Sequence, residues 1–194
     1  MTRRGTTASI SVSSLVGAAV EILQQYGLGD LSMRQVAARL GVQPSALYWH
    51  VKDKQSLLAL VTDRLLEDVR LDPPQQDWRD ELRTRALTLH AALLNTRDAA
   101  ELVATVVALG TGGRRLRTVI AEAVPQHTTL HNTSSSTPDR TIETLVDTVC
   151  SLLLGNALIT QQRAQAAELG VVSADLTPIS ELSLMLDLVL DVFE

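Results

Sequence analysis

Residues 43–54 read Gln-Pro-Ser-Ala-Leu-Tyr-Trp-His-Val-Lys-Asp-Lys, and this stretch decides the fold. Because proline lacks a backbone N–H, it suits the first turn of a helix, so a helix is predicted to begin at Pro44. The whole chain has only 2 Trp, 2 Tyr and 1 Phe, yet Tyr48 and Trp49 are adjacent here and basic residues follow them. A short helix with aromatic, imidazole and ammonium groups suits DNA better than a protein core. The stretch is therefore predicted to be the second helix of a helix-turn-helix.

The residues around this stretch predict three further helices. A first helix is expected over residues 11–26, where apolar residues recur at helical spacing. Ser32 and Gln35 have the spacing of a capping box, which marks the start of a second helix before Gly41. A longer helix is expected over residues 54–70, capped by the aspartate that precedes it.

Residues 71–76 (Leu-Asp-Pro-Pro-Gln-Gln) break the helical pattern and predict a boundary. The predicted domains are residues 1–54, a connecting helix over 54–70, and a second helical domain over 77–194. The fold class is predicted to be all-α, because Leu, Val and Ala dominate and aromatic residues make up only 3%. Later helices are expected over 77–94, 102–109, 114–124, 139–163 and 178–193.

The net charge of −5 conceals an uneven distribution. Residues 1–54 contain six Lys or Arg against three acidic residues, whereas the rest contains 11 bases against 19 acids. A basic N-terminal part on an acidic remainder is typical of a DNA reader with a separate effector domain.

Cys150 is the single cysteine, which excludes an intramolecular disulfide and favours a reducing cytoplasm. No run of about 20 apolar residues lacks a polar break, so a cytoplasmic protein with no membrane partner is expected. The predicted helices 139–163 and 178–193 are apolar on more surface than one subunit can cover. We therefore expect a homodimer held by a four-helix bundle of these helices, with Leu186 at the subunit contact.

Residues 47–54 (Leu-Tyr-Trp-His-Val-Lys-Asp-Lys), with Leu-Ser-Met-Arg-Gln-Val-Ala at 31–37 and Leu-Gly-Val at 40–42, resemble the tetracycline-repressor (TetR) family of transcription regulators. This resemblance spans roughly residues 11–70. Residues 78–83, 92–94 and 154–158 also resemble the C-terminal domain of the tetracycline repressor's own subgroup. The resemblance implies an all-helical homodimeric repressor that binds a palindromic operator and is released by a small molecule in its C-terminal ligand-binding and dimerisation domain.

The resemblance also implies a role for each residue of the DNA-reading part. Arg34 would contact phosphate or a base, and the start of the recognition helix would face base edges. The aromatic and basic residues that follow would bind the DNA backbone, with Lys54 beside the open amides at the start of the helix over 54–70. The implied DNA-binding residues are Arg34, Gln43, Pro44, Ser45, Ala46, Tyr48, Trp49, His50 and Lys54.

The expected effector site departs from that of the tetracycline repressor, which holds a magnesium–drug chelate with histidine and carboxylate groups. The histidine position here is Val103 or Ala108, and the carboxylate position is Ile159 or Thr160. Because these side chains do not bind a hard cation, we expect a mostly apolar organic effector, with no metal and no cofactor. The candidate lining residues are Leu89, His90, Leu93, Val103, Val106, Asn156 and Gln161.

Several other patterns have a plainer explanation than a functional site. Arg3 and Arg4 fit a solvated tail better than a minor-groove arm. His127 and His131 are four residues apart, but they lie in a Ser- and Thr-rich loop and favour solvated histidines over a metal site. We find no nucleophile–base pair with usable spacing, so an enzyme is not expected. The alternative to a ligand-responsive repressor is a constitutive or architectural DNA-binding protein without an effector.

Overall fold

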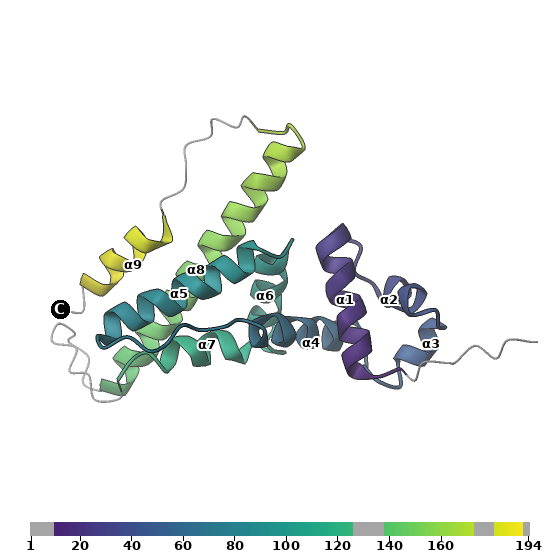
Figure 1. The fold of residues 1–194 in the computed structure, drawn as a ribbon, viewed down its shortest axis with the longest axis horizontal. Helices are drawn as coiled ribbons and strands as arrows, with labels where there is room; N and C mark the ends of the chain where they lie inside the picture. The colour runs from purple at the N-terminus through teal and green to yellow at the C-terminus, as the bar shows by residue number, and fades with distance from the viewer. Residues whose placement is uncertain (1–9, 126–137, 173–180, 192–194) are drawn as a thin grey trace, which may run out of the picture.

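The computed structural model describes residues 10–125, 138–172 and 181–191. Over these ranges the chain is helical, without a strand (Figure 1). The helices are α1 (Val12–Tyr26), α2 (Met33–Leu40), α3 (Pro44–Leu47), α4 (Lys54–Glu67), α5 (Trp78–Leu94), α6 (Ala99–Ala108), α7 (Arg114–Ala121), α8 (Pro138–Glu168) and α9 (Leu182–Asp191). The all-α prediction is confirmed.

Side-chain caps explain where several helices begin. Ser11 precedes α1 in a full capping box with Ser14, because each side chain accepts a backbone N–H of the other residue, at 2.9 and 3.0 Å. At α2, Ser32 accepts the amide of Gln35 at 3.3 Å, as predicted. The predicted return bond from the Gln35 side chain is absent, so this capping box is only half formed.

The predicted helix ends were less accurate than the predicted starts. α8 continues five residues past the predicted end at 163, because residues 164–168 (Ala-Gln-Ala-Ala-Glu) are strong helix formers. α4 and α7 each end three residues before the predicted 70 and 124. α6 begins at Ala99, three residues before the predicted start. The expected helix over 178–193 is observed as Leu182–Asp191, and its predicted ends lie outside the described residues.

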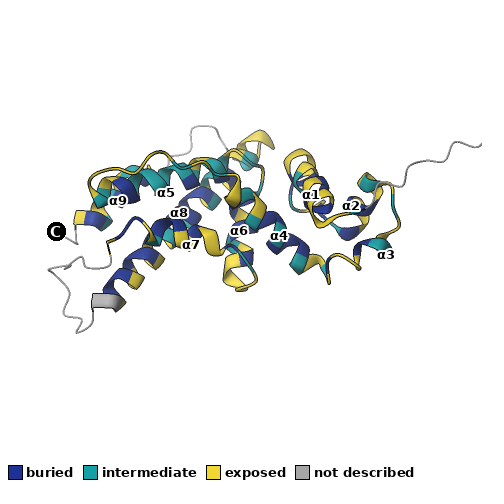
Figure 2. Ribbon diagram, turned by 60° about the horizontal axis from the view of Figure 1, so that its bottom comes forward, coloured by how far each residue is buried: buried dark blue, intermediate teal, exposed yellow. Residues whose placement is uncertain are grey.

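Two apolar cores divide the molecule (Figure 2). We call α1–α3 the head and α5–α9 the body. The head's core also takes the first part of α4, whereas Leu66 near the end of α4 joins the body's core. α6 contributes to both cores: Leu102 and Val106 pack with the head, and Val103 packs with the body. The predicted domain division at residues 54–77 stays a prediction. α6 lies after this division in the sequence, yet two of its residues pack in the head's core.

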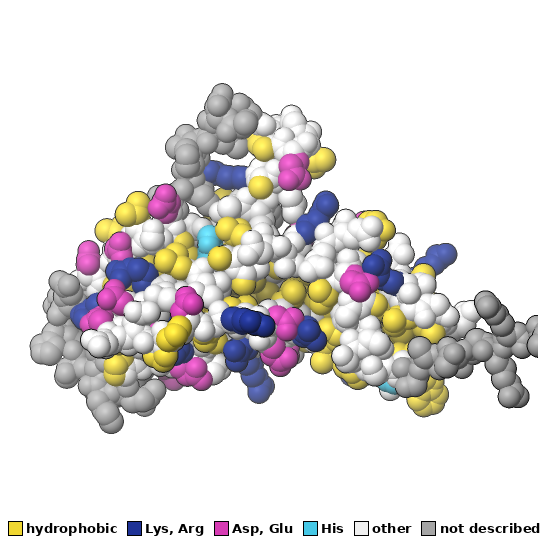
Figure 3. Space-filling model, viewed as in Figure 1, with side chains coloured by type: hydrophobic (Ala, Val, Ile, Leu, Met, Phe, Trp, Pro, Cys, Tyr) yellow, Lys and Arg dark blue, Asp and Glu magenta, His cyan; other side chains and the backbone are white. Residues whose placement is uncertain are grey.

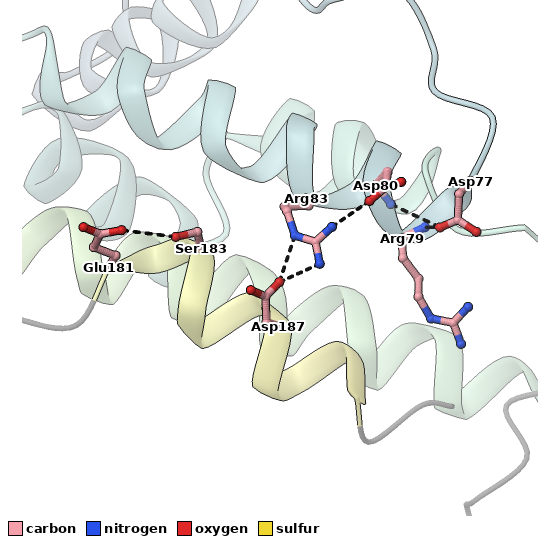
Figure 4. A network of polar contacts seen from close by, with 7 residues as sticks. All are labelled: Asp77, Arg79, Asp80, Arg83, Glu181, Ser183 and Asp187. Atoms are coloured by element: carbon pink, nitrogen blue, oxygen red, sulfur yellow. Dashed lines mark hydrogen bonds and ion pairs between the residues drawn. The ribbon is translucent and has the colours of Figure 1, made fainter.

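Helix α9 is tied to α5 by a network of charged side chains (Figure 4). Nε and Nη2 of Arg83 donate to Oδ1 of Asp187 at 2.9 and 2.5 Å, and its Nη1 donates to Asp80 at 2.7 Å. The apolar side of α9 packs in the body's core through Leu182, Leu186 and Leu190. The network therefore fixes the register of a helix that the core holds on one side only.

Among the described residues, one segment, Arg140–Glu168 of α8, is long and apolar enough to cross a membrane by length and composition. Its most apolar window has a mean hydropathy of 1.5, and 39% of that window is buried inside the structure. Because α8 packs against α5, α6, α7 and α9, its apolar composition is explained by its place in the body's core.

The buried hydroxyl of Thr62 on α4 generates a first prediction. Thr62 is 0% exposed and its Oγ1 has no hydrogen-bond partner in the described structure. Thr62→Val should raise the free energy of unfolding by about 1 kcal/mol, because it removes an unpaired polar group at nearly constant volume. Urea denaturation measures the effect. The control is Thr160→Val, whose hydroxyl donates to the Asn156 carbonyl at 2.8 Å and which should not stabilise. A destabilised Thr62→Val variant would contradict the prediction.

Candidate nucleic-acid interface

A tight turn joins α2 to α3. Gly41 ends α2 in the left-handed conformation (φ 68°, ψ 31°), which glycine adopts without steric cost. The amide of Val42 then donates to the Ala37 carbonyl at 3.0 Å, which closes the end of α2. Gln43 occupies the cap position of α3 and Pro44 its first turn, as predicted. This geometry is that of a helix-turn-helix.

Two buried residues fix the orientation of α3. Leu47 is 0% exposed and Val51 is 4% exposed, and both lie in the head's core. The amides of His50 and Val51 donate to the Leu47 carbonyl at 2.9 and 3.0 Å, so residues 48–50 continue as turns. With the inner side anchored, the opposite side of this segment faces solvent.

Aromatic side chains are unusually exposed on that outer side. Tyr48 is 55% exposed and Trp49 is 90% exposed. Trp49 therefore does not pack under the helix, although its position between Tyr48 and His50 left that possibility open. Exposed aromatic residues of this size are uncommon on a protein surface and mark a contact surface.

Basic residues flank the exposed aromatic side chains. Arg34 in the first turn of α2 and Lys54 at the start of α4 are exposed, and neither forms an ion pair with a described acid. By contrast, Arg39 donates to Glu21 on α1 at 2.6 Å, so its charge is partly neutralised. On the face seen in Figure 3, Lys and Arg side chains are exposed over the head beside a few Asp and Glu, and Asp and Glu are more numerous over the far end of the body.

Asp53 corrects one detail of the predicted interface. Its carboxylate accepts the amide and the hydroxyl of Ser56, each at 2.8 Å. These bonds, the amide first, lower the pKa of Asp53, so it stays ionised at neutral pH. Because Asp53 occupies the Ser56 amide, the N-terminus of α4 offers fewer open amides to phosphate than we expected.

The structure brings the predicted DNA-binding residues onto one surface around α3. Gln43, Pro44 and Ser45 are exposed at its start, and Ala46 is half-buried. His50 is exposed on the far side of Trp49. Their individual roles stay predictions. Arg3, Arg4, His127 and His131 lie outside the described residues.

All of the predicted effector-site residues except Val106 lie where α5, α6 and α8 meet, and several have structural roles. Leu89, Leu93 and Val103 are buried in the body's core, but Val106 faces the head's core and lies apart from them. His90 is half-buried, and its Nε2 lies 2.9 Å from Oδ1 of the buried Asn156. Burial lowers the pKa of His90 and outweighs the opposing effect of the Asn156 hydrogen bond.

Gln161, also predicted to line the effector site, is committed to the backbone. Its Nε2 donates to the carbonyls of Leu93 and Thr96 at 2.8 and 2.7 Å, and its Oε1 accepts the Ala100 amide at 3.1 Å. Because both polar atoms of its side chain form hydrogen bonds to the backbone, Gln161 stabilises the fold.

A cavity that we did not predict lies where α6, α7 and α8 meet. Its volume is about 170 Å³, and its walls include Val107, Leu116 and Leu154. Arg117 and Asp147, paired at 2.8 Å, stand at its rim. Burial raises the pKa of Cys150, which also lines the cavity, to about 11, so the thiol stays protonated at neutral pH. No sequence pattern indicates this cavity, because its residues come from three helices without a shared motif.

Comparison with known proteins identifies the head. The family model described as "Bacterial regulatory proteins, tetR family" matches residues 15–61. The class D tetracycline repressor protein of Escherichia coli is 35% identical over 98 residues, which are 49% of this chain and 45% of that protein. The chain thus spans about half the length of the curated relatives it matches.

Solved structures extend the likeness to the body. The crystal structure of Mycobacterium smegmatis BioQ is 31% identical, with a TM-score of 0.79 over 94% of this chain and 96% of that one. A crystal structure of BioQ with its double-stranded DNA operator is 29% identical, with a TM-score of 0.74 over the same shares. Since the likeness covers head and body together, the chain belongs to the TetR family of bacterial regulatory proteins.

Proposed function

We propose that this chain is a ligand-responsive transcriptional repressor that binds operator DNA as a homodimer and is released by a small, mostly apolar organic molecule. The observation that carries the proposal is the outer side of α3. There, exposed polar and aromatic side chains stand between Arg34 and Lys54, which no described acid neutralises. TetR-family proteins are regulators and not enzymes, and BioQ has been crystallised with its operator.

The proposed division of DNA contacts follows from the geometry of the head. Gln43, Ser45 and Ala46 at the start of α3 would face base edges in the major groove. Tyr48, His50 and Lys54 lie past the buried anchor Leu47 and would contact the sugar-phosphate backbone.

The proposed dimer contact uses surface that the body leaves uncovered. Leu184 and Leu188 of α9 are 59% and 71% exposed, one helical turn apart. Beside them, α8 exposes a stripe of small residues that includes Thr144, Thr148 and Ser151. Small residues allow helices to approach closely, so a second copy would bury the leucines in a four-helix bundle.

The proposed effector site is the cavity among α6, α7 and α8. Asp147 and Ser151 belong both to its wall and to the exposed side of α8, so a second subunit would help to close it. Its apolar walls with few polar groups suit a small organic molecule. We propose this cavity in addition to the residue set that we predicted from the sequence, which stays a prediction.

Ligand binding in this cavity would affect α4 through hydrogen bonds that join α4 to the start of α7. The amide of Gly113, on the cavity wall, donates to Asp63 of α4 at 2.8 Å. Next to it, Nε of Arg115 donates to the Leu66 carbonyl at 3.0 Å. A ligand that displaces the start of α7 would thus move α4 and change the spacing of the two heads. A constitutive DNA-binding protein is the alternative, and it predicts that no small molecule lowers DNA affinity.

The division of DNA contacts gives a second prediction. Lys54→Ala should weaken binding to all duplexes alike and reduce the salt dependence by about one phosphate contact per subunit. Ser45→Ala should instead change which duplexes the protein enriches from a random pool. Fluorescence anisotropy across a salt series measures both variants. Equal losses on enriched and random DNA in both would contradict the division of roles.

The dimer contact gives a third prediction. We expected Leu186 to lie at the contact, but it is 0% exposed in the subunit's own core, so Leu186→Glu would disrupt folding instead. Leu188→Glu should give folded monomers, because it places a charge in the subunit contact only. Light scattering at micromolar concentration measures the mass. The matched control, Leu109→Glu on α6, changes a 56% exposed leucine and should remain dimeric. A monomeric wild type would rule out the contact.

The half-buried imidazole of His90 gives a fourth prediction. Because burial lowers the pKa of His90, the unfolded chain binds more protons than the folded one between the two pKa values. Stability should therefore fall as the pH drops below about 6.5, by at most about 1.4 kcal/mol per unit of pKa separation. Denaturation at pH 7.5 and 5.5 compares the wild type with His90→Gln, which should lose less on acidification. The same loss in both proteins would show that other groups cause the acid sensitivity.

A further inference from the structure

The turn between α5 and α6 holds a residue in an unfavourable conformation. Asp98 has φ 55° and ψ 13°, and it alone among the described non-glycine residues has a positive φ. Residues with a Cβ rarely adopt this left-handed conformation, and they keep it where surrounding contacts determine the backbone. Asp98 occupies the cap position of α6, yet its side chain makes no capping bond to that helix. Its carboxylate is therefore used elsewhere.

Both oxygens of this carboxylate bind other parts of the chain. Oδ2 accepts the backbone N–H of Leu28 at 2.7 Å, in the loop between α1 and α2 of the head. Oδ1 accepts the side-chain amide of Gln165 on α8. Asp98 thus bridges the head's loop, 70 positions away, and the C-terminal part of the longest helix in the body.

The body holds the turn in place from the same side. Gln161 lies one helical turn before Gln165 on α8, and it bonds the carbonyls of Leu93 and Thr96 and the amide of Ala100. The backbone on both sides of Asp98 is therefore fixed to α8 by bonds that do not involve the Asp98 carboxylate. This arrangement explains how the turn maintains its left-handed conformation.

A glycine in the head leaves room for the Asp98 carboxylate. Gly27, next to Leu28, has φ 87°, and a Cβ there would overlap Oδ2 of Asp98 and lie 3.1 Å from Nε of Arg97. Glycine both adopts this backbone conformation and leaves room for the carboxylate. A larger residue would push the loop away from Asp98.

We propose that Asp98 is a positioning residue for DNA reading, which locks the α1–α2 loop of the head to the C-terminal end of α8. The lock connects the body to the head in addition to the covalent connection through α4 and the packing of Leu102 and Val106 in the head's core. α8 also lines the cavity through Cys150 and Leu154, so a shift of α8 is transmitted to the head through Gln165 and Asp98. The effect on DNA rests on the proposed function, but the lock itself does not.

The test uses the full-length chain and three variants. Asp98→Gly removes the carboxylate and leaves a residue that adopts φ 55° without strain. Gln165→Leu breaks only the α8 end of the bridge. Asp77→Gly is the matched control, because Asp77 caps α5 through the amides of Arg79 and Asp80, within the body.

Hydrogen exchange measures the lock without DNA. The Leu28 amide should exchange about tenfold faster in Asp98→Gly, because it loses a hydrogen bond to a charged acceptor. Asp77→Gly should leave this exchange rate unchanged. A wild-type rate in Asp98→Gly, or the same acceleration in Asp77→Gly, would overturn the lock.

DNA binding measures the positioning role. The affinity of Asp98→Gly for duplexes that the wild type enriches from a random pool should fall about tenfold, with random duplexes bound as before. Gln165→Leu should lower the ratio of the affinity for enriched duplexes to that for random duplexes at least threefold. If Asp98→Gly does not fold, Gln165→Leu alone provides the test. An unchanged ratio in both variants would overturn the positioning role. If the wild type enriches no duplex, the proposed function fails, and the exchange rates still decide the lock.

Discussion

The structure depends on the burial of α6 against two cores at once. Leu102 and Val106 lie in the head's core, where α6 packs against α4, and Val103 lies in the body's core, where α6 packs against α5 and α8. Removing these side chains from water favours a fixed arrangement of head and body. Apolar packing alone does not fix the direction in which one part moves relative to the other. Polar contacts at the two ends of α6 add directional constraints to this packing.

The sequence was sufficient to predict the head because its signals are local. A capping serine, a proline at a helix start and a glycine in a turn each act within a few residues, and they placed α1–α3 correctly. The burial of Leu47 and Val51 followed from the same helical spacing. The exposure of the DNA-binding candidates then follows, because the opposite side of a short anchored helix faces solvent.

The body was harder to predict because its contacts are distant in the sequence. Arg83 meets Asp187 across 104 positions, and Leu28 meets Asp98 across 70, with no spacing rule to indicate either pair. The nearly continuous apolar composition of α8 and α9 concealed which side faces the core. Leu186 was therefore assigned to a subunit contact, although Leu184 and Leu188 on either side of it are the exposed residues. The cavity was missed for the same reason, since three helices supply its walls.

The polar contacts at the two ends of α6 reach different parts of the DNA-reading unit. At its N-terminal end, Asp98 binds the head's own loop, while Gln161 and Gln165 fix that turn to α8. Past its C-terminal end, the amide of Gly113 binds Asp63 on α4. A body that changed shape at only one end of α6 would therefore rotate the head about the other end. In the proposed repressor, this two-point attachment would convert a small displacement near α8 into a change in the orientation of α3, which a dimer would have to control to fit successive major grooves.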